Sequence, residues 1–165
     1  MTIKKSVSKK AFPKSAKSPQ KKSGPNIQIL AVETCPSVSG SSTLKYQIGM
    51  SAESSILLKV LSSSGSGFVN PTWFALDDIL NVLVSHSVET PIKSSHLAKG
   101  LELEGRSRND AAFLVAVLVA NEILVPFGDR DKFQWKYASA DAFLAHCEKL
   151  KAGNASKPSR KKAAQ

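Results

Sequence analysis

The sequence predicts an α+β protein: a small antiparallel β-meander, then helices, a β-hairpin and a C-terminal helix. Three observations predict this fold class. Apolar and polar residues alternate with period two in several segments before residue 76. Apolar residues then recur at helical spacing between residues 76 and 122. Finally, a turn with a glycine separates two β-prone runs, Ile123–Phe127 and Lys132–Tyr137.

The meander is expected in the first half of the chain. Pro71 has no backbone N–H to give to a sheet, so the last strand belongs at an edge or a bulge. The serine-rich segments Cys35–Ser42 and Ser62–Gly67 are expected to be loops. Ser62–Gly67 lacks the lysine and the following helix of a phosphate-binding P-loop, so we interpret it as a hairpin turn. The candidate strands are Ile27–Val32, Thr43–Ile48, Ser55–Leu61 and Phe68–Ala75.

The first helix is expected to begin at Leu76. Asp77 and Asp78 occupy its first turn, where carboxylates meet the positive end of the helix dipole. An apolar stripe of helical period follows them. The helix should end near His86, because Pro91 stops any extension.

A second, short helix is expected after Pro91. Ser94 or Ser95 can cap its N-terminus. Leu97 and Leu101 are four residues apart, so both should face inward. Residues 101–104 could continue the helix or run extended.

The third helix is expected over residues 108–122, with Ser107 as its N-cap. Its middle, Ala111–Ala120, is apolar on nearly every face. A buried strand is the competing interpretation, but the run is longer than a typical strand of about 5–6 residues. A helix that is apolar all round is normally buried. It should therefore pack against the N-terminal sheet or a second subunit.

A hairpin follows the third helix, with its turn at Gly128–Asp131. Phe133, Trp135 and Tyr137 alternate with polar residues, which predicts a strand with the three aromatic side chains on one face. Trp135 and Tyr137, with Trp73, could stack on single-stranded bases, although aromatic strand residues usually belong to the core.

A final helix is expected over Ala140–Lys151, capped by Ser139, with Gly153 just beyond its end. Residues 1–25 are rich in Lys, Ser, Ala and Pro and are expected to be disordered, as are residues 153–165. Residues 26–152 should form one globular domain, with the meander at 26–75, helices and hairpin at 76–138, and the final helix at 139–152.

The order of three helices and a hairpin between Leu76 and Tyr137 resembles the winged helix-turn-helix superfamily. The resemblance covers about 60 residues and rests on that order of elements. In the superfamily the third helix enters the major groove of DNA, and the hairpin wing contacts the backbone or the minor groove. The resemblance therefore implies a winged-helix-like unit over residues 76–138.

The same resemblance implies a set of nucleic-acid-binding residues. Arg106, Arg108 and Asn109 would contact DNA at the start of the third helix. Arg130 and Lys132 would contact it from the wing. Basic residues of both tails would add contacts to the phosphate backbone. We single out Lys21, Lys22, Lys161 and Lys162 among these.

The positive charge is concentrated at the two ends of the chain. Residues 1–24 carry eight basic residues and residues 149–165 carry six, with no acidic residue in either segment. Residues 25–148 hold nine basic and thirteen acidic residues. The net charge of +10 therefore comes from the tails, which would attract a polyanion, while the middle of the chain would not. The tails could equally contact anionic lipid, or serve mainly to keep the chain soluble.

No motif of an enzyme, cofactor site or metal site is recognisable. His86, His96 and His146 lack ligand partners at metal-binding spacing, so we expect surface or boundary positions for them. Cys35 and Cys147 are expected to be free thiols in a reducing compartment. The N-terminus has neither a signal-peptide core nor the arginines of a transit peptide, which predicts a cytoplasmic protein, nucleoid-associated in a bacterium. No apolar run is long enough for a membrane span.

The sequence thus leads to two hypotheses. The first is a non-enzymatic DNA-binding or DNA-associated protein that contacts phosphates with little sequence specificity. The second is a protein–protein interaction module, in which a winged-helix scaffold forms a homodimer or binds another protein through helix 111–120. RNA or ribosome association is a further alternative, ranked behind DNA, and no feature of the chain separates the two nucleic acids.

Overall fold

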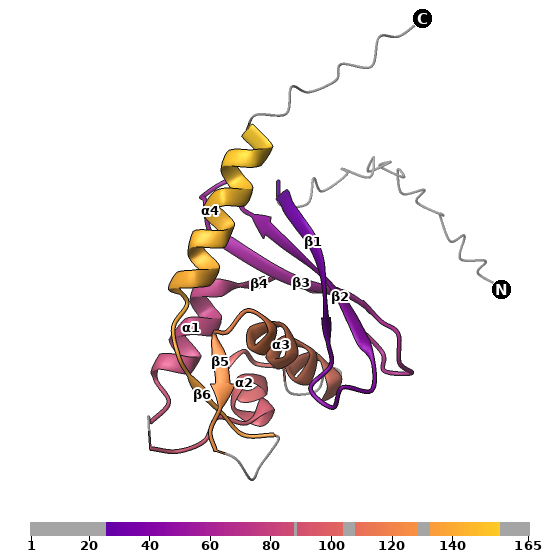
Figure 1. The fold of residues 1–165 in the computed structure, drawn as a ribbon, viewed down its shortest axis with the longest axis vertical. Coiled ribbons are helices and arrows are strands. Elements are labelled where there is room, and N and C mark those ends of the chain that lie inside the picture. Colours follow the sequence, from indigo (N-terminus) through magenta and orange to yellow (C-terminus); the bar gives the residue numbers. More distant parts are fainter. Residues whose placement is uncertain (1–25, 88, 104–107, 129–132, 156–165) are drawn as a thin grey trace, which may run out of the picture.

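The computed structural model describes residues 26–87, 89–103, 108–128 and 133–155. Four strands form one antiparallel sheet in the order β1-β2-β3-β4 (Figure 1). The expected fold class is confirmed, because the sheet is followed by helices, a two-stranded sheet and a C-terminal helix. The strands are β1 (Gln28–Pro36), β2 (Thr43–Met50), β3 (Ile56–Ser63) and β4 (Phe74–Ala75).

The two central strands follow the predicted period of two. Leu44, Tyr46 and Ile48 of β2 are buried, whereas Lys45 between them is exposed. Along β3 the burial alternates in the same way. One face of the sheet therefore packs on the core, as antiparallel sheets commonly do.

The two outer strands differ from the prediction. β1 continues to Pro36, because its residues pair with β2 along the whole strand, up to Pro36 opposite Thr43. The loop expected to begin at Cys35 therefore begins after Pro36. At the other edge, Phe68–Ala75 was expected to be a strand, but only Phe74 and Ala75 pair with β3. The reason is a local turn near Pro71, in which the Thr72 N–H donates to the Asn70 carbonyl at 2.8 Å.

Two helices connect the sheet to the core helix. α1 (Leu76–Val84) and α2 (Ser94–Gly100) match the expected positions. The cap of α2 does not: Lys93 is the N-cap residue, and its N–H donates to His96 Nδ1 at 3.1 Å. The two helices approach closely at Gly100, where a Cβ atom would lie 2.6 Å from Val82. Only glycine fits this crossing without movement of α1.

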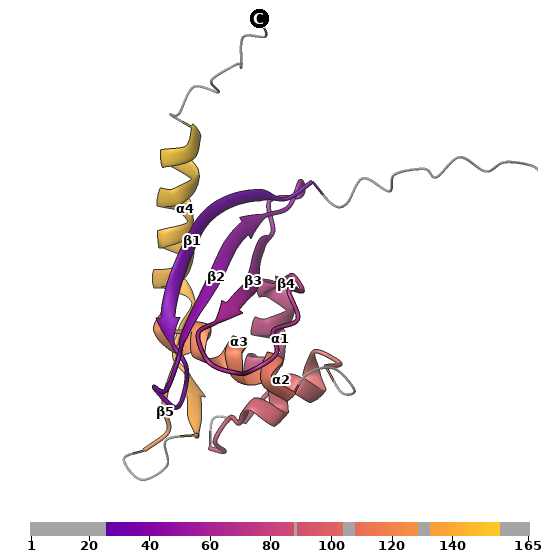
Figure 2. The ribbon, with the colours of Figure 1, turned by 90° about the vertical axis from the view of Figure 1, so that its right-hand side faces the viewer.

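The third helix, α3 (Arg108–Ala120), lies inside the molecule. Its residues from Leu114 to Leu118 are all buried. The helix contacts α2 and β1, and Figures 1 and 2 show it on the same side of the sheet as α1 and α2. The expectation that it packs against the N-terminal sheet is confirmed. A dimer through helix 111–120 stays a prediction, but most of that surface is already covered within the chain.

The hairpin is shorter than predicted. β5 (Leu124–Pro126) pairs with β6 (Trp135–Tyr137). Phe133 lies outside β6 and is 55% exposed. The prediction of a strand over residues 132–137 with three aromatic side chains on one face is therefore wrong for Phe133, and only Trp135–Tyr137 form the strand. Trp135 also pairs with Ile92, through N–H to O distances of 2.7 and 3.0 Å. This bridge ties the α1–α2 connection to the hairpin.

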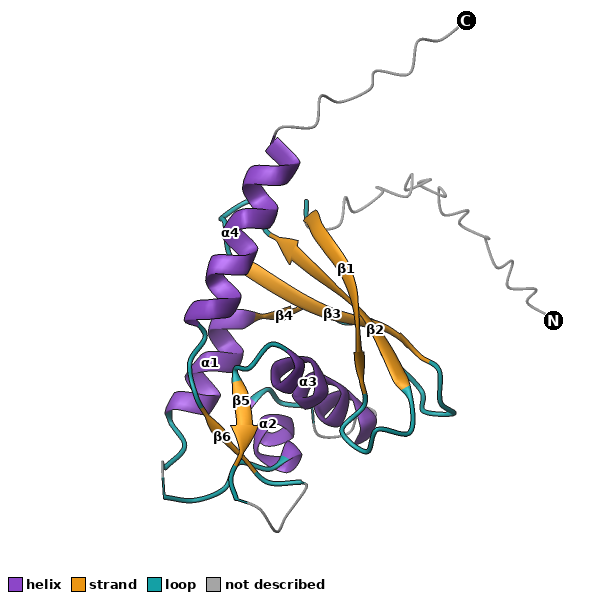
Figure 3. Ribbon diagram, in the orientation of Figure 1, coloured by secondary structure: helices purple, strands orange, loops and turns teal. Residues whose placement is uncertain are grey.

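The last helix, α4 (Asp141–Ala155), lies along the sheet and contacts β1 (Figure 3). The Ser139 hydroxyl accepts a hydrogen bond from the Asp141 N–H at 3.0 Å, close to the expected cap. The helix continues past Gly153, which was expected to lie beyond its end. A glycine inside a helix lowers the stability of the helix but does not by itself end it.

Candidate nucleic-acid interface

Two serine-rich loops meet the start of α3 at one end of the sheet. In an antiparallel meander, the β1–β2 and β3–β4 connections emerge at the same end. Together with α3 and the hairpin they bound a hollow of about 680 Å³, which we call the serine hollow. Seven serines are among its described lining residues, and none of these described residues is acidic. Its walls are the segments Ser37–Ser42, Ser63–Gly67, Asn109–Phe113 and Phe133–Trp135, with Ser94.

Hydrogen bonds between serines order the β1–β2 loop, and one of them reaches across to the end of β3. The Ser39 and Ser41 hydroxyl oxygens are 2.7 Å apart. The Ser42 N–H donates to Ser37 Oγ at 3.2 Å, and the Ser63 hydroxyl donates to Ser42 Oγ at 3.5 Å. A hydroxyl has one donor and two acceptor positions. Serines bonded in this way therefore keep hydrogen-bonding capacity for a ligand.

The β3–β4 loop lies directly on the first turns of α3. A Cβ atom at Gly67 would lie 2.9 Å from Phe113 Cζ and 3.2 Å from Asn109 Nδ2. The Asn70 N–H also donates to Asp110 Oδ1 at 3.4 Å. Asp110 is buried in the first turn of the helix, where the helix dipole favours a carboxylate. These contacts position Asn109 beside the serine loops.

Two exposed phenylalanines accompany the serine hollow. Phe133, on its wall, is 55% exposed. Phe68, which follows Gly67, is 73% exposed. The aromatic residues that the sequence offered for base stacking behave differently: Trp135 is only 5% exposed and belongs to the core, and Tyr137 is half-buried. The most exposed aromatic side chains are thus Phe133, which belongs to the alternation pattern but was not among the residues offered for base stacking, and Phe68.

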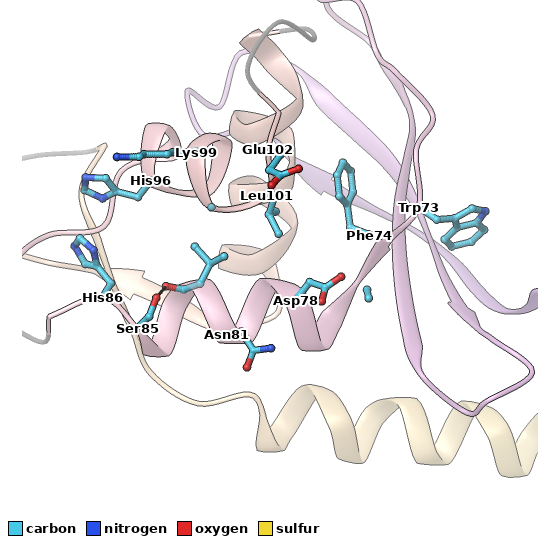
Figure 4. Close-up of a pocket in the computed structure, with 13 residues that line it drawn as sticks. Trp73, Phe74, Asp78, Asn81, Ser85, His86, His96, Lys99, Leu101 and Glu102 are labelled. Carbon is cyan, nitrogen blue, oxygen red and sulfur yellow. Dashed lines mark hydrogen bonds between the residues drawn. The ribbon is translucent and has the colours of Figure 1, made fainter.

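A second hollow, of about 800 Å³, lies between α1 and α2, and we call it the α1–α2 groove. Figure 4 shows His86 and His96 together at one end of it. Asp78 and Glu102 line it nearer the other end. This groove therefore carries carboxylates on its described walls, which the serine hollow does not.

The two histidines of the groove form a ring pair that the sequence did not reveal. The ring centroids of His86 and His96 are 4.5 Å apart. His86 Nε2 lies 3.1 Å from the Thr90 hydroxyl and 3.3 Å from the Pro91 carbonyl oxygen, so its own loop holds the ring. Burial lowers the pKa of His96, and the nearby His86 and Lys93 lower it further. The sequence did hold a signal for this pair: His86 follows α1 and His96 lies in the first turn of α2, so the short connection between the helices brings the two rings near each other.

The described residues offer little for metal or thiol chemistry. Among them, no three His, Cys, Asp or Glu side chains come together as a metal ion would require. Cys35 and Cys147 are free and buried. Burial raises the pKa of each thiol to about 11, so both remain protonated and unreactive near neutral pH.

The two basic ends of the chain join the fold at neighbouring points. The Asn154 side-chain amide, near the end of α4, donates to the Leu30 carbonyl of β1 at 3.0 Å. Leu30 lies only four residues after Asn26, the first described residue. Figure 1 shows the start of β1 and the end of α4 at the same end of the molecule. The two points at which the described fold ends, next to the basic segments of the sequence, are therefore close together in space.

No family model, curated protein or solved structure matches the chain. The site must therefore be judged on its own geometry. Within the described ranges, every helix falls short of the length and apolar character that a bilayer span requires.

Most residues of the sequence-predicted interface lie outside the described part of the chain. Asn109 is described, and it lines the serine hollow. Arg108 begins α3, but its side chain is outside the described residues. The remaining predicted positions are also outside them: Arg106, Arg130, Lys132, Lys21, Lys22, Lys161 and Lys162.

The structure nevertheless brings together the two segments from which this interface was predicted. Asn109 at the start of α3 and Phe133 in the hairpin line the same hollow. The serine loops, which form its other walls, were not predicted from the sequence, because the composition of Ser62–Gly67 indicates only a turn. The available signal was the meander order, which places both serine-rich connections at one end of the sheet.

Proposed function

We propose that this protein is a non-enzymatic nucleic-acid-binding protein, associated with DNA, that contacts phosphates with little sequence specificity. The observation that carries the proposal is the contact between Asn154 and Leu30. This contact places the two points where the basic ends of the chain join the fold close together, and residues 1–24 and 149–165 hold fourteen basic residues and no acidic one. Such a concentration of positive charge attracts a polyanion by counterion release, independently of its sequence.

Within this proposal, the folded part is a winged-helix-like unit braced by the four-stranded sheet. The order of three helices and a hairpin supports it, as does the bridge between Ile92 and Trp135, which joins them into one packed unit. The burial of Leu114 to Leu118 leaves α3 without a polar face for reading bases. Contact would therefore be limited to the start of α3 and the wing, with Arg106, Arg108 and Asn109 on one side and Arg130 and Lys132 on the other.

The proposal is tested by fluorescence anisotropy with a labelled DNA duplex and an RNA of equal length, over a series of salt concentrations. We expect the full chain to bind duplex with a steep slope, about −0.9 in log K against log salt for each phosphate neutralised. In full-length variants whose basic residues become Gln, the loss of slope should be smallest for the six residues of 149–165, larger for the eight of 1–24 and largest for both segments together.

Absence of duplex binding by the full chain at low salt would exclude the proposal. Retention of the full slope after both replacements would show that the tails do not carry the affinity. Stronger binding to RNA than to DNA would favour RNA association instead.

A protein–protein interaction module is the second candidate, and one observation favours it. The helix that reads bases in the winged-helix superfamily is here buried beneath the sheet, a placement that suits a scaffold. Under this alternative, the tail replacements leave the main activity intact, and the chain self-associates or captures a protein. Light scattering coupled to gel filtration measures the self-association directly.

A further inference from the structure

The serine hollow has the size and chemistry of a small-ligand site. Its volume of about 680 Å³ falls within the range of roughly 300–1,000 Å³ that is usual for ligand pockets. One part of its wall is lined by hydroxyl groups and the amide of Asn109, and another by Phe113 and Phe133. A ligand that fits must combine a flat apolar face with several hydrogen-bonding groups.

The aromatic wall is open to such a ligand. Phe133 leaves more than half of its surface exposed, although it lies beside the buried Trp135. A single exposed apolar side chain is ordinary on a protein surface. Here, however, Phe133 lines a polar hollow, and the exposed Phe68 directly follows another lining residue, Gly67. A flat ring placed against Phe133 would cover apolar surface that is otherwise in water.

The described walls of the serine hollow carry no charged residue, so they do not repel an anionic ligand. None of the described lining residues is acidic, in contrast to the α1–α2 groove with Asp78 and Glu102. An anion can therefore approach the serine hollow without facing a carboxylate on its described walls. A nucleotide combines all of these properties: a flat base, hydrogen-bonding edges and a negative phosphate.

The geometry further favours an unpaired nucleotide over a base pair. Stacking on an aromatic side chain requires a base face that is free of its neighbours, as in a single strand. A double helix cannot enter a hollow bounded by two loops, a helix start and a hairpin. The buried α3 cannot enter the major groove instead. The chemistry of the walls and the access to the hollow thus both favour a single-stranded nucleic acid.

We propose that the serine hollow binds one unpaired nucleotide of a single-stranded nucleic acid. The base stacks on Phe133, and the serine hydroxyls and Asn109 hydrogen-bond to its polar groups. This inference rests on the proposed function, because it names the form of nucleic acid that the folded part recognises. The tails bind any polyanion, whereas the hollow adds a preference for single strands.

The test uses the full-length protein, with labelled oligothymidylate and a DNA duplex of equal length measured in parallel. Phe133→Ala should weaken single-strand binding about 5- to 150-fold, the range for loss of one stacked base. Its binding to duplex should stay unchanged, because the tails are intact. Phe133→Trp should restore single-strand binding. Leu144→Ala, which removes an exposed apolar side chain on α4, is the matched control and should change neither.

The outcomes separate this inference from the proposed function. Binding of both nucleic acids with no effect of Phe133→Ala on the single strand would overturn the inference and leave the proposed function standing. Equal weakening of both ligands would also overturn it. Failure of the wild-type chain to bind either nucleic acid would remove both proposals. Because Phe133 is exposed, thermal unfolding of Phe133→Ala should match wild type and exclude a folding defect.

Discussion

The helices α3 and α4 both pack against β1, but they are held there in different ways. α3 is surrounded by the fold, and its residues from Leu114 to Leu118 are buried. α4 buries one face, with Phe143 and Cys147, and leaves Leu144 39% exposed. The two helices therefore have different roles. α3 belongs to the core, and only its N-terminal part is accessible to a ligand. α4 packs on the outside of the fold and braces the sheet.

Polar contacts complete the attachment of α4. His146 Nε2 lies 2.9 Å from Glu33 Oε1 on β1. The other carboxylate oxygen of Glu33 accepts a hydrogen bond from the Tyr46 hydroxyl at 2.7 Å. The Asn121 amide, just after α3, donates to that same hydroxyl at 3.1 Å. This polar network therefore links both helices to the sheet, and it explains why Tyr46 can be only 2% exposed.

The largest expected effect comes from a cavity in α3. Leu118→Ala removes a side chain that is fully buried, so both apolar burial and packing are lost. The free energy of unfolding should fall by about 2–5 kcal/mol. Urea denaturation followed by circular dichroism measures it. The matched change on α4, Leu144→Ala, should cost less than about 1 kcal/mol. Similar losses for the two variants would contradict the distinction between core helix and outer brace.

A smaller effect is expected at the polar network. Glu33→Ala removes the acceptor of the Tyr46 hydroxyl, which stays buried, and the partner of His146. A buried donor left without an acceptor costs about 1–3 kcal/mol. Burial, which remains in this variant, raises the pKa of Tyr46, so its hydroxyl cannot escape this cost by ionising.

A double-mutant cycle isolates that cost. Tyr46→Phe removes the hydroxyl, so the double variant should be less destabilised than the sum of the two single variants. Glu53→Ala, in the exposed turn between β2 and β3, is the control and should change stability by at most about 0.5 kcal/mol. Strict additivity of Glu33→Ala and Tyr46→Phe would show that the network contributes no coupling.

The same contrast explains how much of the fold could be predicted from the sequence. Strands β2 and β3 were predictable because alternation with period two is a local pattern. The burial of α3 was predictable because its run Ala111–Ala120 leaves no polar face. The full length of β1 was not predictable, because its pairing with β2 continues to Pro36, through residues whose composition indicates a loop. The irregular path before β4 depends on a turn near Pro71 that no periodicity signals.

The candidate site was less predictable, because it depends on contacts between distant segments. The importance of Asn109 followed from its place at the start of the third helix. Its neighbours in the β1–β2 loop are about 70 residues away in the chain, so only the sheet order brings them to it. The closeness of the points where the two basic ends join the fold likewise depends on contacts between α4 and β1, among them those of Asn154 with Leu30 and of His146 with Glu33. Such contacts leave no trace in composition or spacing.

The smallest expected effect on the free energy of unfolding is at the C-terminal end of α3. Glu122 follows the helix with a φ of +58°, in the left-handed region. The Ile123 N–H donates to the Leu118 carbonyl at 2.9 Å, and the Glu122 N–H donates to the Val119 carbonyl at 3.0 Å. These bonds form a Schellman cap, in which glycine is the usual residue at the left-handed position. Glutamate there bears conformational strain and a negative charge at the negative end of the helix dipole.

Glu122→Gly should therefore raise the free energy of unfolding by about 0.5–1 kcal/mol, because relief of the left-handed strain exceeds the entropy that glycine adds to the unfolded chain. Glu122→Ala is the matched control, since it removes the charge but keeps the strain. If strain dominates, the alanine variant should gain little and the glycine variant more, in urea denaturation at the same pH. Equal gains would assign the effect to the helix dipole. A loss of stability with glycine would mean that Glu122 makes a stabilising contact through its side chain.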